Sequence, residues 1–239
     1  PLPFTDVKIL EINRKDEVVR ECQFDEPGEI CINNPGIVVG STYTDPNKNI
    51  SLFVDDKFLR TGDIGYMDAD GYLWLTGRAK DVIMRGGHNI DPLIIEEALA
   101  GHPSISLAGA IGQPDIYSGE LPCAYVELVS GSATSVGELM EYAQQNVSDK
   151  TACPKYIEIL EELPKTAIGK VFKPDLRRLA IIRTFNDILV ENNINAKVNN
   201  VIEDKKLGLV AKLDKIDSET SDQQINNVLG QFIIPWQWN

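Results

Sequence analysis

The spacing of apolar residues changes character near Asp91, and this change restricts the folds open to the 239-residue chain. Before Asp91, short strand-like segments such as VKILEI (7–12) and GEICINN (28–34) alternate with turn formers. Asp70-Gly71 lies between two apolar runs, which is typical of a tight hairpin because Gly tolerates a positive φ. Residues 1–79 are therefore expected to form a small β-rich region.

Strands and helices alternate after Asp91. The segment DPLIIEEALAGHP has an acid, then Pro at the first helical position and Gly101 at the end, which are helix boundary signals. Two strand-like segments, a helix over about 135–146 and the strand YIEIL (156–160) follow. This order is typical of an α/β or α+β domain and extends to about residue 178.

A further small α/β unit is expected in the remaining residues, 179–239. A helical apolar period begins after Pro174, and a hairpin and a short helix near 223–229 follow. No internal repeat is apparent. The sequence as a whole predicts an α+β fold in three parts, of which the first two meet near Arg78 to Gly87.

Composition excludes several classes of protein. The formal net charge of -13 argues against general nucleic-acid binding, which requires a basic face. The four cysteines show no metal-ligand spacing, so we expect no metal site in this chain and a reducing cytoplasm around it. No apolar run is long enough for a membrane span. Because the first residue is Pro1 and not Met, a fragment of a longer protein is expected.

One segment contrasts with this acidic composition. LPKTAIGKVFKPDLRR (163–178) holds the five cations Lys165, Lys170, Lys173, Arg177 and Arg178 and a single carboxylate. A phosphate-binding P-loop is excluded, because Pro164 and Val171 stand where that motif needs Gly and Ser or Thr. The segment instead predicts a turn, in which Gly169 frees the backbone to present Lys170 at a loop tip.

Two other segments hold candidate binding residues. In TGRAKDVIMRGGHNID (76–91), cations surround Asp81, and Gly86-Gly87 lets the backbone approach a ligand closely. In RTGD (60–63), Asp63 ends a strand, where its carboxylate can accept two hydroxyl hydrogens from a ribose.

These motifs, in the order RTGD, TGRAKDVIMRGGHNIDPxxIEEAL and LPKTAIGK, resemble the C-terminal portion of the adenylate-forming enzymes. That family includes acyl-CoA synthetases, aryl-CoA ligases, luciferases and peptide-synthetase adenylation domains. The resemblance runs from about Gly28 to Arg178. It implies that residues 1–79 are the β-rich end of an N-terminal adenylation domain, that 80–178 are a mobile cap domain carrying a hinge and a catalytic lysine, and that 179–239 are an extension.

The resemblance also implies roles for single residues in adenylation. Asp63 would hold the ribose hydroxyls of ATP and AMP, and Arg78 would lie near the ribose and the α-phosphate. Lys170 would bind nucleotide and act catalytically, by bridging the acyl carboxylate and the α-phosphate. Its cationic neighbours would help to meet the phosphates of ATP and CoA.

Thioester formation would use a different set of residues. The resemblance places the hinge at Lys80, and the loop brought to the active site for CoA at Gly86, Gly87 and Asn89. The implied activity is that of an ATP-dependent acid–thiol ligase, which activates a fatty or aryl carboxylic acid as acyl-AMP and transfers it to CoA. The Mg2+ site, the phosphate loop and the acyl tunnel are expected on the missing N-terminal domain, so the fragment is expected to be inactive alone.

Other interpretations stay open. Within the same chemistry, the acceptor could be the phosphopantetheine of a carrier protein. The chain could instead be a non-catalytic binding or assembly module, with a homo-oligomer formed through the C-terminal extension. Read alone, Lys170 is a solvated turn lysine, Asp63 a turn cap and Gly86-Gly87 a structural turn.

Overall fold

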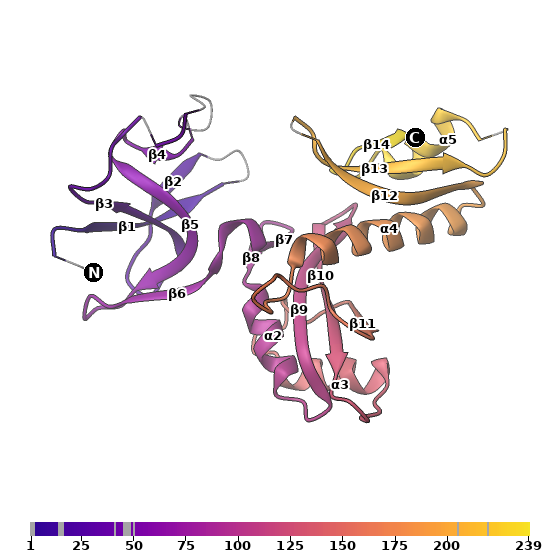
Figure 1. Cartoon of the computed structure of the whole chain (residues 1–239), viewed down its shortest axis with the longest axis horizontal. Helices are drawn as coiled ribbons and strands as arrows, with labels where there is room; N and C mark the ends of the chain where they lie inside the picture. The colour runs from indigo at the N-terminus through magenta and orange to yellow at the C-terminus, as the bar shows by residue number, and fades with distance from the viewer. Residues whose placement is uncertain are drawn as a thin grey trace. The chain divides into compact units, whose positions relative to one another are not determined.

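The computed structural model describes residues 3–13, 17–40, 42–44, 49, 51–204, 206–218 and 220–239. The chain divides into two compact units, Pro1–Asp81 and Val82–Asn239 (Figure 1). The described residues contain four α-helices and fourteen strands, so the α+β prediction is confirmed.

The first unit is an antiparallel sheet with the strand order β2-β1-β3-β5-β4, and β6 pairs directly with the later residues of β5, Asp63–Met67. Its small core includes Leu10, Cys31 and Phe58, all buried. A short 3-10 helix, Ala79–Asp81, ends the unit. The strands are β1 (Asp6–Ile12), β2 (Val18–Glu21), β3 (Gly28–Asn33), β4 (Phe53–Val54), β5 (Phe58–Met67) and β6 (Leu73–Arg78).

The turn at Asp70-Gly71 forms as the sequence predicts. The Asp68 carboxylate accepts hydrogen bonds from the backbone of Tyr72 and from the Trp74 indole, each at 2.8 Å. Gly71 adopts φ +82°, a conformation that strains any residue with a Cβ. The turn therefore sets the pairing of β5 with β6, which places Asp63 opposite Arg78.

The second unit begins with a sheet centred on β10. This strand pairs antiparallel with β9 and with β7, and parallel with β11. The elements are β7 (Ile83–Arg85), β8 (His88–Ile90), α2 (Pro92–Ala100), β9 (Ile105–Asp115), β10 (Gly119–Leu128), α3 (Val136–Asn146) and β11 (Tyr156–Leu160). The predicted boundary signals of α2 are confirmed, since Asp91 is its N-cap, Pro92 its first residue and Gly101 its C-cap.

Both faces of this sheet are covered by helices. Alternate residues of a strand point to opposite faces. Ala124 and Val126 of β10 accordingly pack with the core of α2 and α3, whereas Cys123 and Tyr125 pack with Leu176 of the next helix, α4 (Lys173–Glu191).

Helix α4 also packs against a second sheet. The elements that follow it are β12 (Ala196–Asp204), β13 (Gly208–Lys215), α5 (Asp222–Leu229) and β14 (Trp236–Trp238). Phe185 and Leu189 of α4 pack with Val198, Leu213 and Ile225 in a separate core. Figure 1 shows α4 between the sheet of β9 and β10 and the strand β12, both of which it contacts.

The two halves of the second unit share one topology. Residues 92–160, the first module, run helix, antiparallel hairpin, helix, and then a strand parallel to the second hairpin strand. Residues 173–238, the second module, repeat this order and these strand directions. In each module the second helix starts at a serine capping box, at Ser135 and at Ser221. The repeat lies in topology and not in recognisable sequence.

A polar contact fixes α4 to the first module. The Arg183 guanidinium lies 3.4 Å from the centre of the Tyr156 ring and donates a 2.8 Å hydrogen bond to Gln113. Cation–π contacts of this kind add to the apolar packing. Because α4 runs without interruption through residue 178, the boundary after that residue stays a prediction.

The structure shows the state of the four cysteines and the character of the helices. All four cysteines are free thiols, and burial raises the pKa of both Cys31 and Cys123 to about 12, so neither is a reactive thiolate at neutral pH. Among the described helices, none combines the length and the apolar composition needed to cross a bilayer.

We expect Phe185→Ala to destabilise the second unit by about 3–5 kcal/mol, because it leaves a cavity at a fully buried site of α4. Urea unfolding of the intact chain measures this loss. Val190→Ala on the same helix is the matched control; its side chain is 74% exposed, and a change within about 0.5 kcal/mol is expected. Equal effects of the two substitutions would contradict the position of α4 between two cores.

Candidate functional site

Asp63 and Arg78 form a cross-strand pair in the first unit. They lie opposite each other on β5 and β6, and Arg78 Nε is 2.8 Å from Asp63 Oδ1. The side chains are 28% and 58% exposed, respectively, so both are open to a ligand. The Arg78 contact is at Asp63 Oδ1, and the structure describes no hydrogen bond that is donated to Asp63 Oδ2 by the residues it covers. This oxygen can accept a hydroxyl hydrogen, so the pair fits a ribose.

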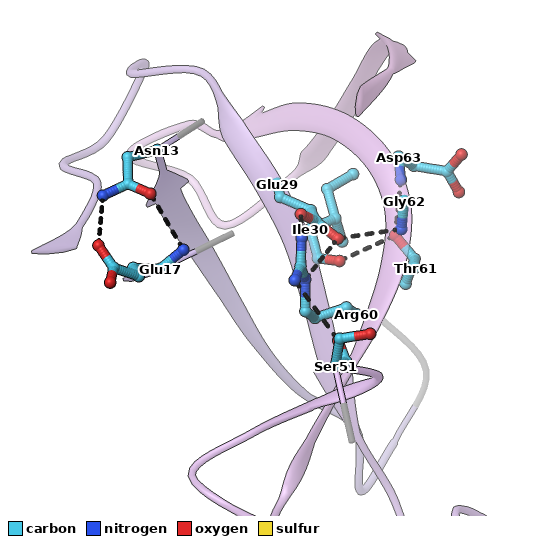
Figure 2. Close-up of polar contacts among 9 residues, drawn as sticks. All are labelled: Asn13, Glu17, Glu29, Ile30, Ser51, Arg60, Thr61, Gly62 and Asp63. Carbon is cyan, nitrogen blue, oxygen red and sulfur yellow. Dashed lines mark hydrogen bonds and ion pairs between the residues drawn. The ribbon is translucent and has the colours of Figure 1, made fainter. Parts of the chain in front are cut away.

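A buried ion pair supports the strand just before Asp63. Glu29 is only 3% exposed, and Arg60 Nη2 lies 2.8 Å from its carboxylate (Figure 2). The same carboxylate accepts a hydrogen bond from the backbone of Gly62 at 3.3 Å. Gly62 has φ +71°, which favours glycine. Arg60 and Gly62 of the RTGD motif are therefore structural residues that hold Asp63.

Thr61 fixes the backbone at the same place. Its hydroxyl donates to the Ile30 carbonyl at 2.8 Å and accepts from the backbone N–H of Asp63 at 3.1 Å. In Figure 2 the side chain of Asp63 points away from the Glu29–Arg60 pair. The motif thus separates a buried half that anchors the strand from an exposed half that is available to a ligand.

Lys80 lies in the short helix Ala79–Asp81, at the end of the first unit, and is exposed. The division of the chain after Asp81 places Lys80 in the segment that joins the two units.

Gly86 and Gly87 form a two-residue turn between β7 and β8. Both have positive φ, +57° and +92°, as a type I′ turn requires. A Cβ at either position would meet no atom within 4 Å, so these glycines are required by backbone conformation and not by packing. Gly86 donates a 2.8 Å hydrogen bond to the Ser118 carbonyl, which holds the turn against the sheet, and Asn89 is exposed on β8.

Lys170 lies on a short hairpin, residues 163–172, which we call the lysine hairpin. The backbone of Thr166 donates to the Lys170 carbonyl at 2.7 Å, and Gly169 donates to the Thr166 carbonyl at 2.9 Å. Gly169 has φ +80°. This is the three-residue hairpin loop in which a turn is followed by a left-handed glycine. The predicted turn at Gly169 is confirmed, and Lys170 follows it as an exposed residue.

Several cations of this region already have carboxylate partners. Lys165 Nζ lies 2.9 Å from Glu127, Lys173 Nζ lies 2.9 Å from Glu96, and Arg178 Nη1 lies 2.6 Å from Asp175. For the Lys170 ammonium, no hydrogen bond or ion pair joins it to any residue that the structure describes. Most of the cation cluster is thus neutralised within the protein, which leaves the exposed Lys170 as a cation available to an anionic ligand.

Two carboxylates of the site, Glu127 and Glu96, were not singled out from the sequence. Besides its lysine, each of them also binds a backbone N–H. Glu127 Oε2 accepts the backbone N–H of Leu163 at 2.9 Å, and Glu96 Oε1 accepts that of Ala110 at 2.8 Å. The Leu163 N–H, and then Lys165, hold the pKa of Glu127 below its usual range, so it is ionised at neutral pH. The only local sequence feature that could have indicated Glu127 is the position of this carboxylate within the apolar strand segment AYVELV.

The site residues are held on separate elements of two units. Asp63 and Arg78 are in contact on the first unit, whereas the Gly86-Gly87 turn and the lysine hairpin belong to the second. In the described part of the chain, no group of three or more His, Cys, Asp or Glu side chains could hold a metal ion.

The chain is similar in sequence to a known enzyme domain and to known ligases. Residues 94–170, which end at Lys170, match the AMP-binding enzyme C-terminal domain. The chain is 36% identical to marinolic acid–CoA ligase of a Pseudoalteromonas species over 99% of this chain and 36% of that protein. It is 38% identical to a long-chain-fatty-acid–CoA ligase of Bacillus subtilis over 67% of this chain and 28% of that protein.

A solved structure gives the same result. The o-succinylbenzoate CoA synthetase of Bacillus subtilis, in complex with an acyl-adenylate intermediate, superposes with a TM-score of 0.61 and 33% identity. The match covers 74% of this chain and 34% of that protein.

Fold, motifs and relatives together define the C-terminal region of an AMP-binding enzyme. The chain belongs to the adenylate-forming family that contains the acyl-CoA ligases, which confirms the resemblance seen in the sequence. It spans about a third of the length of the relatives that it matches.

We expect Arg60→Met to destabilise the first unit by about 3–5 kcal/mol, because it leaves the buried carboxylate of Glu29 without its cation. Urea unfolding of the intact chain measures the change. Arg20→Met in β2 is the control, since Arg20 pairs with Glu26 at the surface and a much smaller effect is expected. A loss of similar size in both variants would rule out the anchoring role of Arg60.

Proposed function

We propose that this chain is the C-terminal part of an AMP-forming acid–CoA ligase, and that Lys170 is its catalytic cation for adenylation. The observation that carries the proposal is the exposed Lys170 ammonium at the tip of a hairpin, among neighbours already paired with carboxylates. The matched family domain, which extends through this hairpin as far as Lys170, supports the same role.

In the first step, a carboxylate oxygen of the acid attacks the α-phosphate of ATP. An acyl–phosphate bond forms, the bond between the α- and β-phosphates breaks, and pyrophosphate leaves with the electron pair. Two anions must approach each other, so a cation aimed at both lowers the barrier. Lys170 would supply this charge, while Asp63 would accept the ribose hydroxyl hydrogens and Arg78 would lie near the ribose and α-phosphate.

In the second step, the thiol of CoA attacks the acyl carbonyl, loses its proton, and displaces AMP. Lys170 is not needed for this step, and the Gly86-Gly87 turn with Asn89 would meet the incoming thiol. An exchange of the two loops requires the second unit to rotate. The position of Lys80 in the segment that joins the units supports its role as the hinge.

The proposed substrates are a fatty or aryl carboxylic acid, ATP and CoA. Mg2+ would accompany ATP, with ligands outside residues 1–239. The relatives named as CoA ligases favour CoA as the acceptor over a carrier-protein phosphopantetheine. The same names favour a ligase over a non-catalytic assembly module.

The proposal also places the protein in the cytoplasm. Its four free cysteines support this location, because cytosolic reductants keep thiols unpaired. A homo-oligomer formed through residues 179–239 stays a prediction.

Lys170→Ala in the parent enzyme should lower the adenylation rate by about 100- to 1,000-fold, the usual cost of removing one preorganised transition-state donor. Pyrophosphate exchange measures adenylation, and thioester formation from supplied acyl-adenylate and CoA measures the second step, which should persist. Lys155→Ala, an exposed lysine outside the hairpin, is the matched control and should change neither step. Normal exchange by the Lys170 variant would refute the proposed role.

Residues 1–239 alone should show no ATP–pyrophosphate exchange, because the chain spans about a third of its ligase relatives. The measurement is incorporation of labelled pyrophosphate into ATP with a panel of fatty and aryl acids. The parent enzyme in the same assay is the positive control. Exchange by the 239 residues would show that they contain a complete adenylation site.

A further inference from the structure

The lysine hairpin is held at its base and is exposed at its tip. Ile168, next to Gly169, is 79% exposed, and the tip residues Ala167, Gly169 and Lys170 are also exposed. Hydrogen bonds between its own two strands, such as that from Phe172 N–H to the Pro164 carbonyl at 2.7 Å, give the hairpin its shape. They do not fix its direction relative to the sheet, so that direction depends on contacts at its base.

Glu127 of β10 holds the incoming side of the hairpin by two bonds. Its Oε2 atom accepts the Leu163 N–H at 2.9 Å and lies 2.9 Å from Lys165 Nζ. Its side chain is 17% exposed, so the ion pair is partly shielded from water. Leu163 itself is 1% exposed, and it packs in the core between the first module and α4. The carboxylate thus joins the hairpin to the central strand of the sheet.

Glu96 of α2 holds the outgoing side in the same manner. Its Oε1 atom lies 2.9 Å from Lys173 Nζ, at the first residue of α4, and accepts the Ala110 N–H of β9 at 2.8 Å. The two side chains are 17% and 18% exposed. On the incoming side Lys165, and on the outgoing side Lys173, directly after the hairpin, therefore tie the hairpin to carboxylates that are themselves bonded to backbone.

We propose that Glu127 and Glu96 are positioning residues for adenylation, which clamp the two ends of the lysine hairpin and so aim Lys170 at the reacting groups. This inference rests on the proposed role of Lys170. Neither carboxylate touches substrate. Because Lys170 acts only in the first step, a clamp that serves Lys170 affects adenylation and leaves thioester formation unchanged. A purely structural contact would affect both steps together.

Glu127→Gln in the parent enzyme tests the clamp. The amide oxygen still accepts the Leu163 N–H, while the attraction to Lys165 is lost. Pyrophosphate exchange should fall by about tenfold or more, since a misplacement of roughly 1 Å can cost about 100-fold. Thioester formation from supplied acyl-adenylate and CoA should keep its rate, and the melting temperature should stay close to that of the parent enzyme.

Glu162→Gln is the matched control. Glu162 lies 3.4 Å from the same Lys165 ammonium, but its side chain is 76% exposed. Removing its charge should leave both steps unchanged, because exposed ion pairs contribute little. The double variant Lys165→Met with Glu127→Gln should lose little more pyrophosphate exchange than either single variant, since the two residues act as one pair.

Three results would overturn the clamp. They are normal exchange in Glu127→Gln, a parallel loss of both steps, and equal losses in Glu127→Gln and Glu162→Gln. If Lys170→Ala abolishes exchange while Glu127→Gln does not, the clamp fails and the proposed function stands. If Lys170→Ala itself is harmless, the proposed function fails first.

Discussion

The second unit depends on the burial of two sides of α4. Leu176 and Ala180 pack against the sheet of the first module, while Phe185 and Leu189 complete the core of the second. A helix that buries apolar side chains on two sides links the stability of the structures it joins. The lysine hairpin leads directly into α4, at Lys173, so the segment that carries Lys170 is fixed at one end by this helix.

Charge pairing explains how a protein of net charge -13 presents a cation. The abundant carboxylates neutralise Lys165, Lys173 and Arg178 and in doing so orient the segments to which these residues belong. Lys170 extends beyond them at a glycine-supported tip. An acidic surface repels anionic ligands, so attraction for a phosphate has to be local, and in the proposed function the Lys170 ammonium would provide it.

The RTGD motif shows a similar division between support and function. Arg60 and Gly62 bind the buried Glu29, and Asp63 directs its carboxylate away from them (Figure 2). The role proposed for Asp63 thus rests on a strand whose position is set by a buried ion pair. Replacing Arg60 would alter the proposed ribose site at Asp63 indirectly, through the strand.

The sequence alone determined the features that depend on neighbouring residues. Positive φ at Gly71, Gly86, Gly87 and Gly169, the caps of α2, and the helical and strand periods follow from local chemistry, which acts over a few residues. The order of three motifs identified the family. Only the tertiary structure decided which carboxylate meets which cation, as for Glu127 and the hairpin, whose Leu163 lies 36 residues away in sequence. It also decided that residues 173–238 repeat the topology of 92–160. Such contacts depend on strand pairing and core packing, which bring distant residues together and leave no fixed spacing in the sequence.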